Sequence, residues 1–191
     1  MIKVLIKTAC YIATLTAVSA SLALAADDPP FTLPAQSELR KLKSAKIITN
    51  KGEIILELYP EYAPWHVANL KYLADKGFYR NLRFHKYRPK YMVQTGAPGA
   101  SVASGPGYTL PPEFNELKHV PGAVSMVRPP DILDLDHRRR SHGSQFRIMM
   151  LPNRLMDGQY TVFAKVISGM EVVRRLRLND FVKDIRVYVR Q

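Results

Sequence analysis

Short apolar segments with a two-residue period run through most of this chain, and this alternation constrains its fold more than any other feature. In a strand, successive side chains point to opposite faces, so the period predicts seven or eight short strands. They fall at residues 45–49, 53–58, 83–87, 91–94, 122–127, 144–151, 160–166 and 183–190. Helical spacing occurs in only two places, which is too few to connect the strands of a parallel sheet. The sequence therefore predicts a mainly β protein, a closed antiparallel barrel with helices at its ends.

Two stretches carry the spacing of an amphipathic helix. The first begins at Pro64, whose fixed φ suits a first helical turn, and it ends before Gly77, a residue type favoured just after helices. The second covers residues 169–178 and places three apolar side chains on one side: Met170, Val173 and Leu176. No internal repeat is visible, so we expect these elements to form one domain.

The first 25 residues have the composition of a secretory signal peptide. Lys3 and Lys7 precede an uncharged stretch that ends in a small-x-small pattern at residues 23–25, which signal peptidases cut. A membrane anchor is the alternative, because the uncharged stretch is at the lower limit of spanning length. We expect cleavage, and therefore an exported protein, periplasmic or secreted, without a stable membrane anchor. Cys10 would leave with the signal, so the mature chain would form no disulfide.

The remaining 166 residues (191 minus 25) suffice for a single domain with a sizeable core, and we expect a monomer. We assign residues 26–44, which contain three prolines, to a loosely packed arm, and residues 45–191 to the domain. Without the two signal lysines the chain has 26 basic residues (28 minus 2) against 16 acidic ones, a net charge of +10. This charge favours anionic partners such as acidic peptides. Binding of nucleic acid through the basic loop Pro129–His142 is disfavoured, because that loop lacks interleaved aromatic residues.

Several chemistries lack the residues that they need. The glycine-rich stretch 96–107 is followed by no Lys-Ser/Thr and no helix, so it predicts a loop and no phosphate cradle. A metal site would need ligands next to the triplet Arg138–Arg140, which opposes a cation, so we expect no metal and no cofactor. The ligands considered are Asp134, Asp136, His137 and His142. With no serine in an elbow motif and no cysteine left, we expect a site that binds without forming covalent bonds.

Six ordered segments of the chain resemble the cyclophilins, the barrel-shaped peptidyl-prolyl isomerases. The segments are "FHK" (84–86), "YMVQTG" (91–96), "GPGYTLPPEF" (105–114), "GAVSM" (122–126), "GSQF" (143–146) and "LMDGQYTVFAKVISGMEVV" (155–173). The resemblance extends from about Ala45 to Gln191, nearly the whole mature chain. It implies a closed eight-stranded antiparallel barrel capped by two α-helices, which agrees with the strand count above, and a peptidyl-prolyl cis-trans isomerase activity.

The resemblance also implies how such a protein would rotate the bond before proline. In cyclophilins an arginine after Phe-His donates to the proline nitrogen, and a glutamine on the neighbouring strand holds the carbonyl. Gln94 matches that glutamine, whereas Lys86 stands in place of the catalytic arginine. A lysine is a point charge on a flexible stem and lacks the rigid fork of a guanidinium, so we expect reduced activity.

The other positions of the family's substrate-binding site match unevenly. Met92 and Gln145 keep the family's residue types, and Tyr91 replaces a phenylalanine. Arg147 stands where a phenylalanine floors the proline pocket, and Arg128 replaces a small polar residue whose backbone pairs with the peptide. The remaining implied substrate-binding residues are Val127, Leu155, Met156 and Tyr160, the last three in place of Trp or another aromatic, Leu and His.

Two functions remain open from the sequence. One is a prolyl isomerase that acts on X-Pro bonds in exported proteins. The other is a cyclophilin-shaped binding module for proline-containing or acidic peptide segments, which is favoured by the cation of Arg147 because a buried charge opposes an apolar proline ring. We predict the isomerase, since Met92, Gln94 and Gln145 are retained.

Overall fold

The computed structural model describes residues 28–100, 104–129 and 139–190. The predicted signal peptide and most of the basic loop before residue 139 lie outside these ranges. The same holds for three of the metal ligands considered above, Asp134, Asp136 and His137. Within the described ranges, no helix has the length and apolar character needed to cross a membrane.

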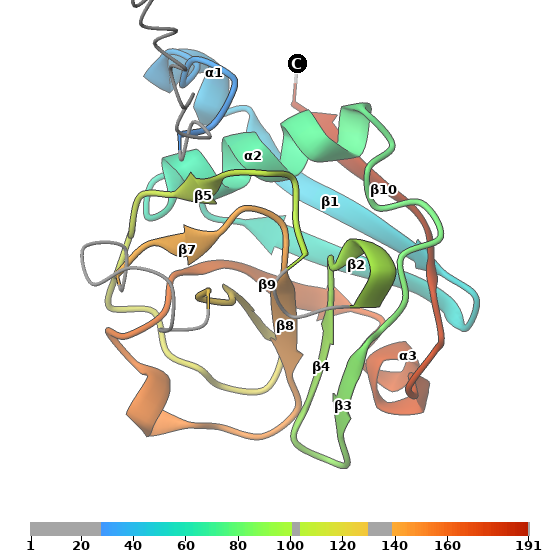
Figure 1. Ribbon diagram of the computed structural model, residues 1–191. Coiled ribbons are helices and arrows are strands. Elements are labelled where there is room, and N and C mark those ends of the chain that lie inside the picture. The colour runs from blue at the N-terminus through green and yellow to red at the C-terminus, as the bar shows by residue number, and fades with distance from the viewer. Residues whose placement is uncertain (1–27, 101–103, 130–138, 191) are drawn as a thin grey trace, which may run out of the picture.

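The central element is an antiparallel sheet of eight strands that curls into a half-barrel (Figure 1). Its strand order is β10-β1-β2-β9-β6-β8-β4-β3. In chain order these strands are β1 (Leu42–Thr49), β2 (Gly52–Leu58), β3 (Lys86–Arg88), β4 (Met92–Thr95), β6 (Ala123–Met126), β8 (Phe146–Met149), β9 (Val162–Ser168) and β10 (Val182–Val189). A separate pair consists of β5 (Thr109–Leu110) and β7 (Ser141–His142). The prediction of a mainly β, antiparallel fold is confirmed.

The predicted closure of the barrel is not confirmed. The edge strands β10 and β3 form no ladder with each other in the described sheet. Just before β3, one isolated bridge joins Arg83 to Phe181, and the N–H of Phe84 donates to the Asp180 carbonyl at 2.7 Å. The left-handed backbone of Asn81, with φ 63°, interrupts regular strand geometry immediately before these contacts. Residues 81–84 and 179–182 are joined by this bridge and by four backbone hydrogen bonds, but β3 and β10 themselves are not paired, so the sheet remains open.

The predicted helix after the first hairpin is α2 (Pro64–Asp75), which crosses one end of the curled sheet (Figure 1). Pro64 occupies its first turn, as expected. The Glu113 carboxylate accepts from the N–H groups of Trp65 and His66 at 3.0 and 3.1 Å. These bonds satisfy donors that have no partner inside the helix, and a negative charge stabilises a helix N-terminus.

The second predicted helix is shorter than expected. It is α3 (Met170–Arg175), which packs against β2 at the other end of the sheet (Figure 1). Leu176, which we placed inside the helix, is its C-cap and is fully buried, together with Val173. The apolar spacing thus identified two buried side chains correctly, whereas Met170 is only partly buried, and Val172, which it did not include, is buried. A short helix α1 (Gln36–Leu39) was not predicted.

Residues 28–44 pack against the domain, which differs from the loosely packed arm that their prolines predict. The ring of Phe31 lies 4.9 Å from that of Tyr72 and 5.7 Å from that of Trp65, between centroids. Leu39 is buried, and β1 begins three residues before the predicted start of the domain. These apolar side chains lack a helical or strand period, and for that reason the sequence pattern did not reveal their contacts with α2.

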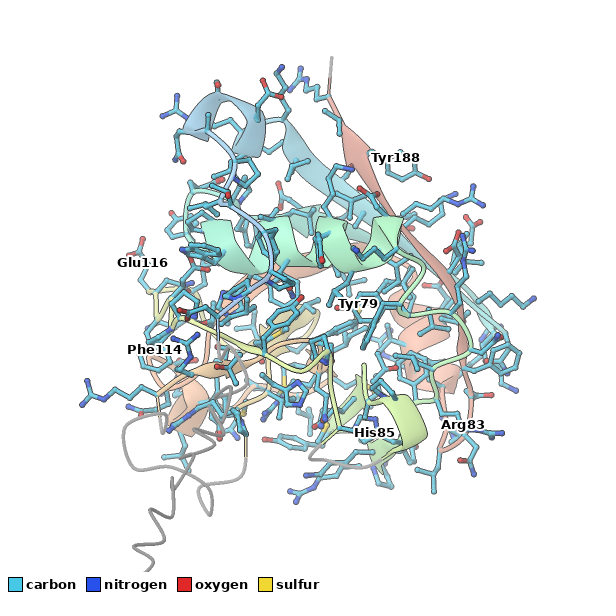
Figure 2. All side chains as sticks on the ribbon, turned by 45° about the horizontal axis from the view of Figure 1, so that its top comes forward. Tyr79, Arg83, His85, Phe114, Glu116 and Tyr188 are labelled. Carbon is cyan, nitrogen blue, oxygen red and sulfur yellow. The ribbon has the colours of Figure 1, made fainter. Side chains whose placement is uncertain are left out.

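The two faces of the sheet bury two different apolar clusters. The main core lies on the face shared with α2 and α3, and Tyr79 lies in it beneath α2 (Figure 2). Ile54, Leu56 and Leu58 of β2 are at most 1 % exposed there, as their alternation predicts. The smaller cluster, here named the methionine cluster, consists of Met92, Ala123, Met149, Met156 and Val162, with Tyr91, Leu117 and Tyr160 packed against it.

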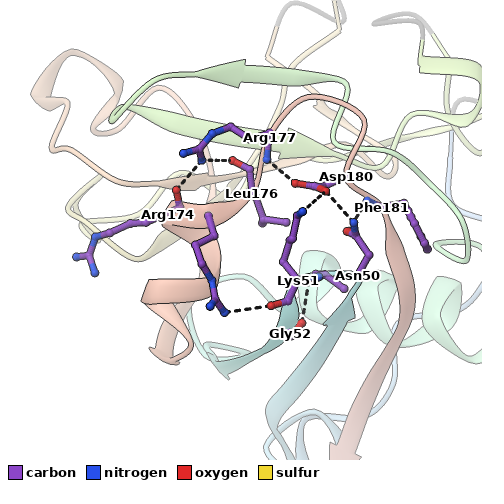
Figure 3. A network of polar contacts seen from close by, with 10 residues as sticks. Asn50, Lys51, Gly52, Arg174, Leu176, Arg177, Asp180 and Phe181 are labelled. Atoms are coloured by element: carbon purple, nitrogen blue, oxygen red, sulfur yellow. Dashed lines mark hydrogen bonds and ion pairs between the residues drawn. The ribbon is translucent and has the colours of Figure 1, made fainter.

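A polar network around Asp180 joins the first hairpin, α3 and β10 (Figure 3). The Asp180 carboxylate accepts from Asn50 Nδ2 and from the N–H of Arg177, both at 2.7 Å, and Lys51 Nζ lies 3.5 Å away. The Arg177 guanidinium donates to the Arg174 carbonyl at the end of α3. Burial alone would raise the pKa of Asp180, but these donors and the lysine charge outweigh it and lower the pKa. We name Asp180, Asn50, Lys51 and Arg177 the Asp180 network.

Candidate active site

Lys86 and Gln94, the two predicted catalytic residues, are direct partners across the β3–β4 ladder. Gln94 is in turn the partner of Arg147 across β4 and β8. Residues directly opposite each other in antiparallel strands project from the same face, so the three side chains form one row. The neighbouring row projects into the main core and consists of Tyr87, Val93 and Ile148. We name the face that carries Lys86, Gln94 and Arg147 the site face.

Gln94 and Gln145 form a buried carboxamide pair on this face, with exposed fractions of 3 % and 0 %. Gln94 Nε2 donates to Gln145 Oε1 at 3.0 Å and lies 3.2 Å from His85 Nε2. Gln145 Nε2 donates to the Ser104 carbonyl at 2.9 Å. One proton of the Gln94 amide is thus donated to Gln145, and His85 lies within hydrogen-bond distance of the same nitrogen. Such a preorganised donor needs little rearrangement on binding.

His142 supports this pair, although the sequence analysis considered it only as a metal ligand. Its Nδ1 accepts from the N–H groups of Ser144 and Gln145, both at 3.1 Å. Its Nε2 lies 3.1 Å from Gln145 Nε2. Burial, followed by the charge of nearby His85, lowers the pKa of His142 to about 4, so the ring is neutral at pH 7. Its position directly before "GSQF" was the available signal for this role.

Gly96 allows β4 to approach the segment before β8 closely. Its φ is 94°, and a Cβ at this position would collide with the Ser144 carbonyl. The Ser144 hydroxyl also donates to the Gly96 carbonyl at 2.7 Å. This close approach holds Gln145, the residue after Ser144, against Gln94.

The methionine cluster forms the apolar part of the site and brings together four predicted residues. Met92 and Met156 belong to it, and Tyr91 and Tyr160 pack at its edge. Tyr91 Oη donates to Met156 Sδ at 3.7 Å and accepts a hydrogen bond from Asn153, a residue that the sequence analysis did not consider. Thioether side chains are flexible and polarisable, so they adapt well to an apolar ligand such as a proline ring.

Two guanidinium groups lie against the ring of Tyr160. The Cζ atoms of Arg147 and Arg128 are 4.6 and 5.9 Å from the ring centroid. Arg147 Nη1 also donates to Met156 Sδ at 3.8 Å. The Nε atoms of both arginines are buried and have no hydrogen-bond partner among the described residues. Burial lowers the pKa of Arg147.

Lys86 ends the row at the outer strand of the sheet. It is only partly exposed, and burial, followed by the charges of Arg88 and Arg147, lowers its pKa. Its ammonium group makes no hydrogen bond or ion pair with any described residue, whereas Lys46 and Lys71 each hold a carboxylate. The donors of Lys86 are therefore available to a ligand.

Two of the implied substrate-binding residues, Leu155 and Val127, lie outside the methionine cluster. Leu155, in the 3₁₀ turn η2 (Arg154–Met156), is 88 % exposed and does not belong to the methionine cluster. Val127 uses its backbone internally, since its N–H donates to Gln145 at 2.9 Å and its carbonyl accepts from His142 at 2.7 Å. Leu155 is thus accessible from solvent next to the methionine cluster, and the backbone of Val127 is engaged within the protein; their contacts with a substrate stay predictions.

Two further histidine–carboxylate pairs serve the fold. His66 Nδ1 lies 2.5 Å from Glu113, which caps α2, and His119 Nδ1 lies 3.0 Å from Asp157, which also accepts the His119 N–H. A pocket of about 510 Å³ beside the second pair contains none of the predicted site residues. In the parts of the chain that the structure describes, no three His, Cys, Asp or Glu side chains are grouped as metal ligands.

A fixed amide donor, an available ammonium group and an apolar cluster on one sheet face define a site suited to a polypeptide segment. The chain belongs to the cyclophilin-type peptidyl-prolyl cis-trans isomerase family and is an isomerase, because the family model "Cyclophilin type peptidyl-prolyl cis-trans isomerase/CLD" matches residues 44–188. Peptidyl-prolyl cis-trans isomerase B of Bacillus subtilis is 38 % identical over 143 residues, which are 74 % of this chain and 94 % of that protein. A peptidyl-prolyl cis-trans isomerase of Helicobacter pylori is 34 % identical over 154 residues, 78 % of this chain and 90 % of that protein.

Solved structures agree with this assignment. A crystal structure of a cyclophilin type peptidyl-prolyl cis-trans isomerase of Cryptosporidium parvum superposes with a TM-score of 0.68 at 26 % identity, covering 78 % of this chain and 99 % of that chain. A crystal structure of the same protein in the presence of the dipeptide Ala-Pro gives a TM-score of 0.67 at 27 % identity, covering 76 % and 98 %. The family resemblance predicted from the sequence is confirmed.

Proposed function

We propose that this chain accelerates rotation about X-Pro bonds, with Lys86 donating to the proline nitrogen and Gln94 donating to the preceding carbonyl. The pairing of these two residues across the β3–β4 ladder carries the proposal. Directly opposite residues have Cβ atoms about 4.5–5.5 Å apart. One peptide bond can therefore contact both groups at once.

The reaction needs differential binding and no covalent chemistry. Rotation about a peptide bond costs about 18–20 kcal/mol because twisting breaks its resonance. The cis and trans forms of X-Pro differ by only about 0.5–1 kcal/mol, so stabilising the twisted state is sufficient. Twisting localises a lone pair on the proline nitrogen, and a donor aimed at it becomes stronger as the barrier is climbed. The unpaired ammonium of Lys86 is suited to that role.

The methionine cluster is the proposed contact surface of the proline ring. It lies on the site face because Met92 is two residues before Gln94 in β4, so both side chains project from the same side. The Cryptosporidium parvum relative, studied in the presence of Ala-Pro, supports proline-containing peptides as substrates. We further propose that the substrates are exported polypeptides and that the protein acts as a monomer; the signal-like residues 1–25 support the export.

The lysine is expected to make this isomerase slower than relatives that carry arginine at this position. A guanidinium presents several donors in a rigid plane, whereas an ammonium on a flexible stem is less well oriented. If the difference equals the loss of one oriented donor, about 2–4 kcal/mol, the rate is lower by roughly 10²–10³. The Lys86→Arg variant is therefore predicted to be the faster enzyme.

The test is the rate of cis–trans exchange of a neutral Xaa-Pro peptide, measured by NMR without a coupling protease. Wild type should accelerate exchange, and Lys86→Ala should lose most of this acceleration. Lys183→Ala, which removes an exposed lysine of β10, serves as the matched control and should behave like wild type. Equal exchange rates for wild type and Lys86→Ala would refute the role of Lys86.

A second candidate is a binding module with negligible turnover, and Arg147 is the observation that favours it. A guanidinium beside Met156 and Tyr160 makes the methionine cluster less apolar than a proline ring requires. Exchange rates at background for wild type and all variants, together with measurable peptide binding, would support this candidate.

A further inference from the structure

Three cations on the site face, Lys86, Arg128 and Arg147, lack an anionic partner among the described residues. We name them the cation triad. Other partly buried cations of the protein are paired, for example Lys46 with Glu53 at 2.8 Å.

Of the three cations, Arg147 has the surroundings that are least favourable for a charge without an anionic partner. Its Nε is buried without a hydrogen-bond partner, and Nη1 reaches only a thioether sulfur, a weak acceptor. The Tyr160 ring at 4.6 Å supplies a cation–π contact, which offsets part of the desolvation. A guanidinium has five donors, and no ion pair with a described carboxylate uses those of Arg147.

Arg128 adds a second charge at the same place. Its Cζ lies 5.9 Å from the centroid of the Tyr160 ring that Arg147 also contacts, and its Nε is likewise buried without a partner. Two guanidinium groups against one ring repel each other, and partial burial strengthens that repulsion. An anion between or beside them would relieve the repulsion and would meet planar donors that match a carboxylate in bidentate geometry.

We infer that this isomerase prefers proline peptides that carry a carboxylate side chain within two residues of the X-Pro bond, with Arg147 and Arg128 binding the carboxylate. This inference rests on the proposed function, because it places the X-Pro bond at Lys86 and Gln94. Gln94 and Arg147 are partners on adjacent strands, and adjacent strands are about 4.8 Å apart. An extended peptide advances about 3.3 Å per residue, so one or two residues span that distance.

The experiment compares isosteric peptides that differ only in charge. One pair has Glu or Gln directly before proline, and the other has Glu or Gln directly after it; all peptides are acetylated and amidated, so no terminal carboxylate is present. The kcat/KM for exchange and the Kd from calorimetry are both measured. We expect the Glu peptide to be favoured over its Gln partner by about tenfold in at least one pair, the size of one charge-assisted hydrogen bond.

Variants then assign the preference to the arginines. Arg147→Met keeps side-chain length and suits the methionine cluster, and it should reduce the Glu/Gln ratio to near one. Arg128→Met should reduce it in part and provides a second route if the first variant folds poorly. Arg40→Met, which removes an exposed arginine after α1, is the charge-matched control and should keep the wild-type ratio.

The outcomes separate this inference from the proposed function. Turnover of the Gln peptides tests the isomerase alone, and the Glu/Gln ratio in kcat/KM or Kd tests the preference. A ratio near one in both pairs, or a ratio that Arg147→Met and Arg128→Met leave unchanged, would overturn the inference even if turnover is fast. A preference in Kd without any turnover would retain the anion site and refute the isomerase.

Discussion

The Asp180 network and the cation triad both gather cations around buried polar groups, but they differ in what balances the charge. In the network, Lys51 lies 3.5 Å from the Asp180 carboxylate, which also receives two hydrogen bonds at 2.7 Å. In the triad, Lys86, Arg128 and Arg147 have no carboxylate partner in the described part of the chain. Lysine and arginine side chains thus have a carboxylate partner in the first region and none among the described residues in the second.

We attribute this difference to function: the Asp180 network stabilises the fold, whereas the cation triad is a candidate site for an anionic ligand. A buried charge with hydrogen-bonded partners is tolerated by the fold, whereas one without them costs stability. Clusters that keep such a cost are candidates for functional sites, because a ligand can supply the missing partner. We therefore expect changes in the Asp180 network to alter folding and changes in the triad to alter ligand selection.

The largest expected effect is on the pH dependence of stability. It differs between His142, which is neutral in the folded site, and Asp180, which is ionised. The pKa of His142 is about 4, below its ordinary value of about 6.5, so the unfolded chain takes up this proton first as the pH falls. The contribution of His142 to stability is complete above about pH 6.5, and roughly 2–4 kcal/mol is lost as the pH falls to 4. Asp180, whose pKa is also lowered, should lose its contribution only below about pH 3.9.

Urea unfolding between pH 3 and pH 7 checks this expectation. His142→Gln should have a smaller pH slope than wild type between about pH 6.5 and 4, and Asp180→Asn should differ from wild type in slope only at lower pH. Wild type and His142→Gln curves that run parallel through this window would contradict the assigned environment of His142.

The next effect is the loss of the acceptor at the centre of the Asp180 network. Asp180→Ala leaves the N–H of Arg177 and the amide of Asn50 without their partner, so it should lower the free energy of unfolding by about 2–3 kcal/mol. Asp75→Ala is the matched control, because it removes an exposed carboxylate paired with Lys71, and it should cost less than about 0.5 kcal/mol. Similar losses in the two variants would show that the network does not hold the fold.

A smaller effect on the free energy of unfolding is expected when an arginine is replaced by methionine, once in the Asp180 network and once in the cation triad. Arg177→Met removes the hydrogen bond to the Arg174 carbonyl and the contact with Tyr87, whose ring centroid is 5.1 Å from Cζ, so stability should fall by about 1 kcal/mol. Arg147→Met removes a buried charge without a partner, so stability should be unchanged or rise by about 1 kcal/mol. The comparison fails if Arg147→Met proves as destabilising as Arg177→Met in urea unfolding.

The smallest effect is the response of the two regions to salt. The preference of the site for a Glu over a Gln peptide depends on charges that a ligand reaches from solvent, so it should fall about threefold between roughly 0.05 M and 0.5 M NaCl. The partly buried contacts of Asp180 are screened less, and the stability difference between wild type and Asp180→Ala should change little. A Glu/Gln ratio that is independent of salt would argue against an electrostatic origin.

Local patterns in the sequence predicted the strands and the long helix well. The alternation of Ile54, Leu56 and Leu58 placed all three in the main core, and Pro64 marked the start of α2. The packing of Phe31 on α2 and the open edge of the sheet were not predicted. Both depend on contacts between segments far apart in the chain, for which the local period of apolar residues carries no information.

The candidate site shows the same limit. Lys86 and Gln94 were expected together because the family resemblance implies neighbouring strands for them, and they are direct partners. The meeting of Arg128 and Arg147 at Tyr160 joins three separate segments, so only the structure reveals it. The family pattern implied a ligand contact for Leu155, which is 88 % exposed beside the Asn153 cap, and that contact stays a prediction.

The central claim is that the ammonium group of Lys86 stabilises the twisted X-Pro bond, and exchange kinetics of the Lys86→Arg variant test it most directly. With a neutral proline peptide, kcat/KM should rise at least about tenfold over wild type, since a rigid guanidinium orients its donors better than a lysine. The free energy of unfolding serves as the control and should stay within about 0.5 kcal/mol of wild type, as for a surface substitution. No increase in kcat/KM in a folded Lys86→Arg protein would contradict the account.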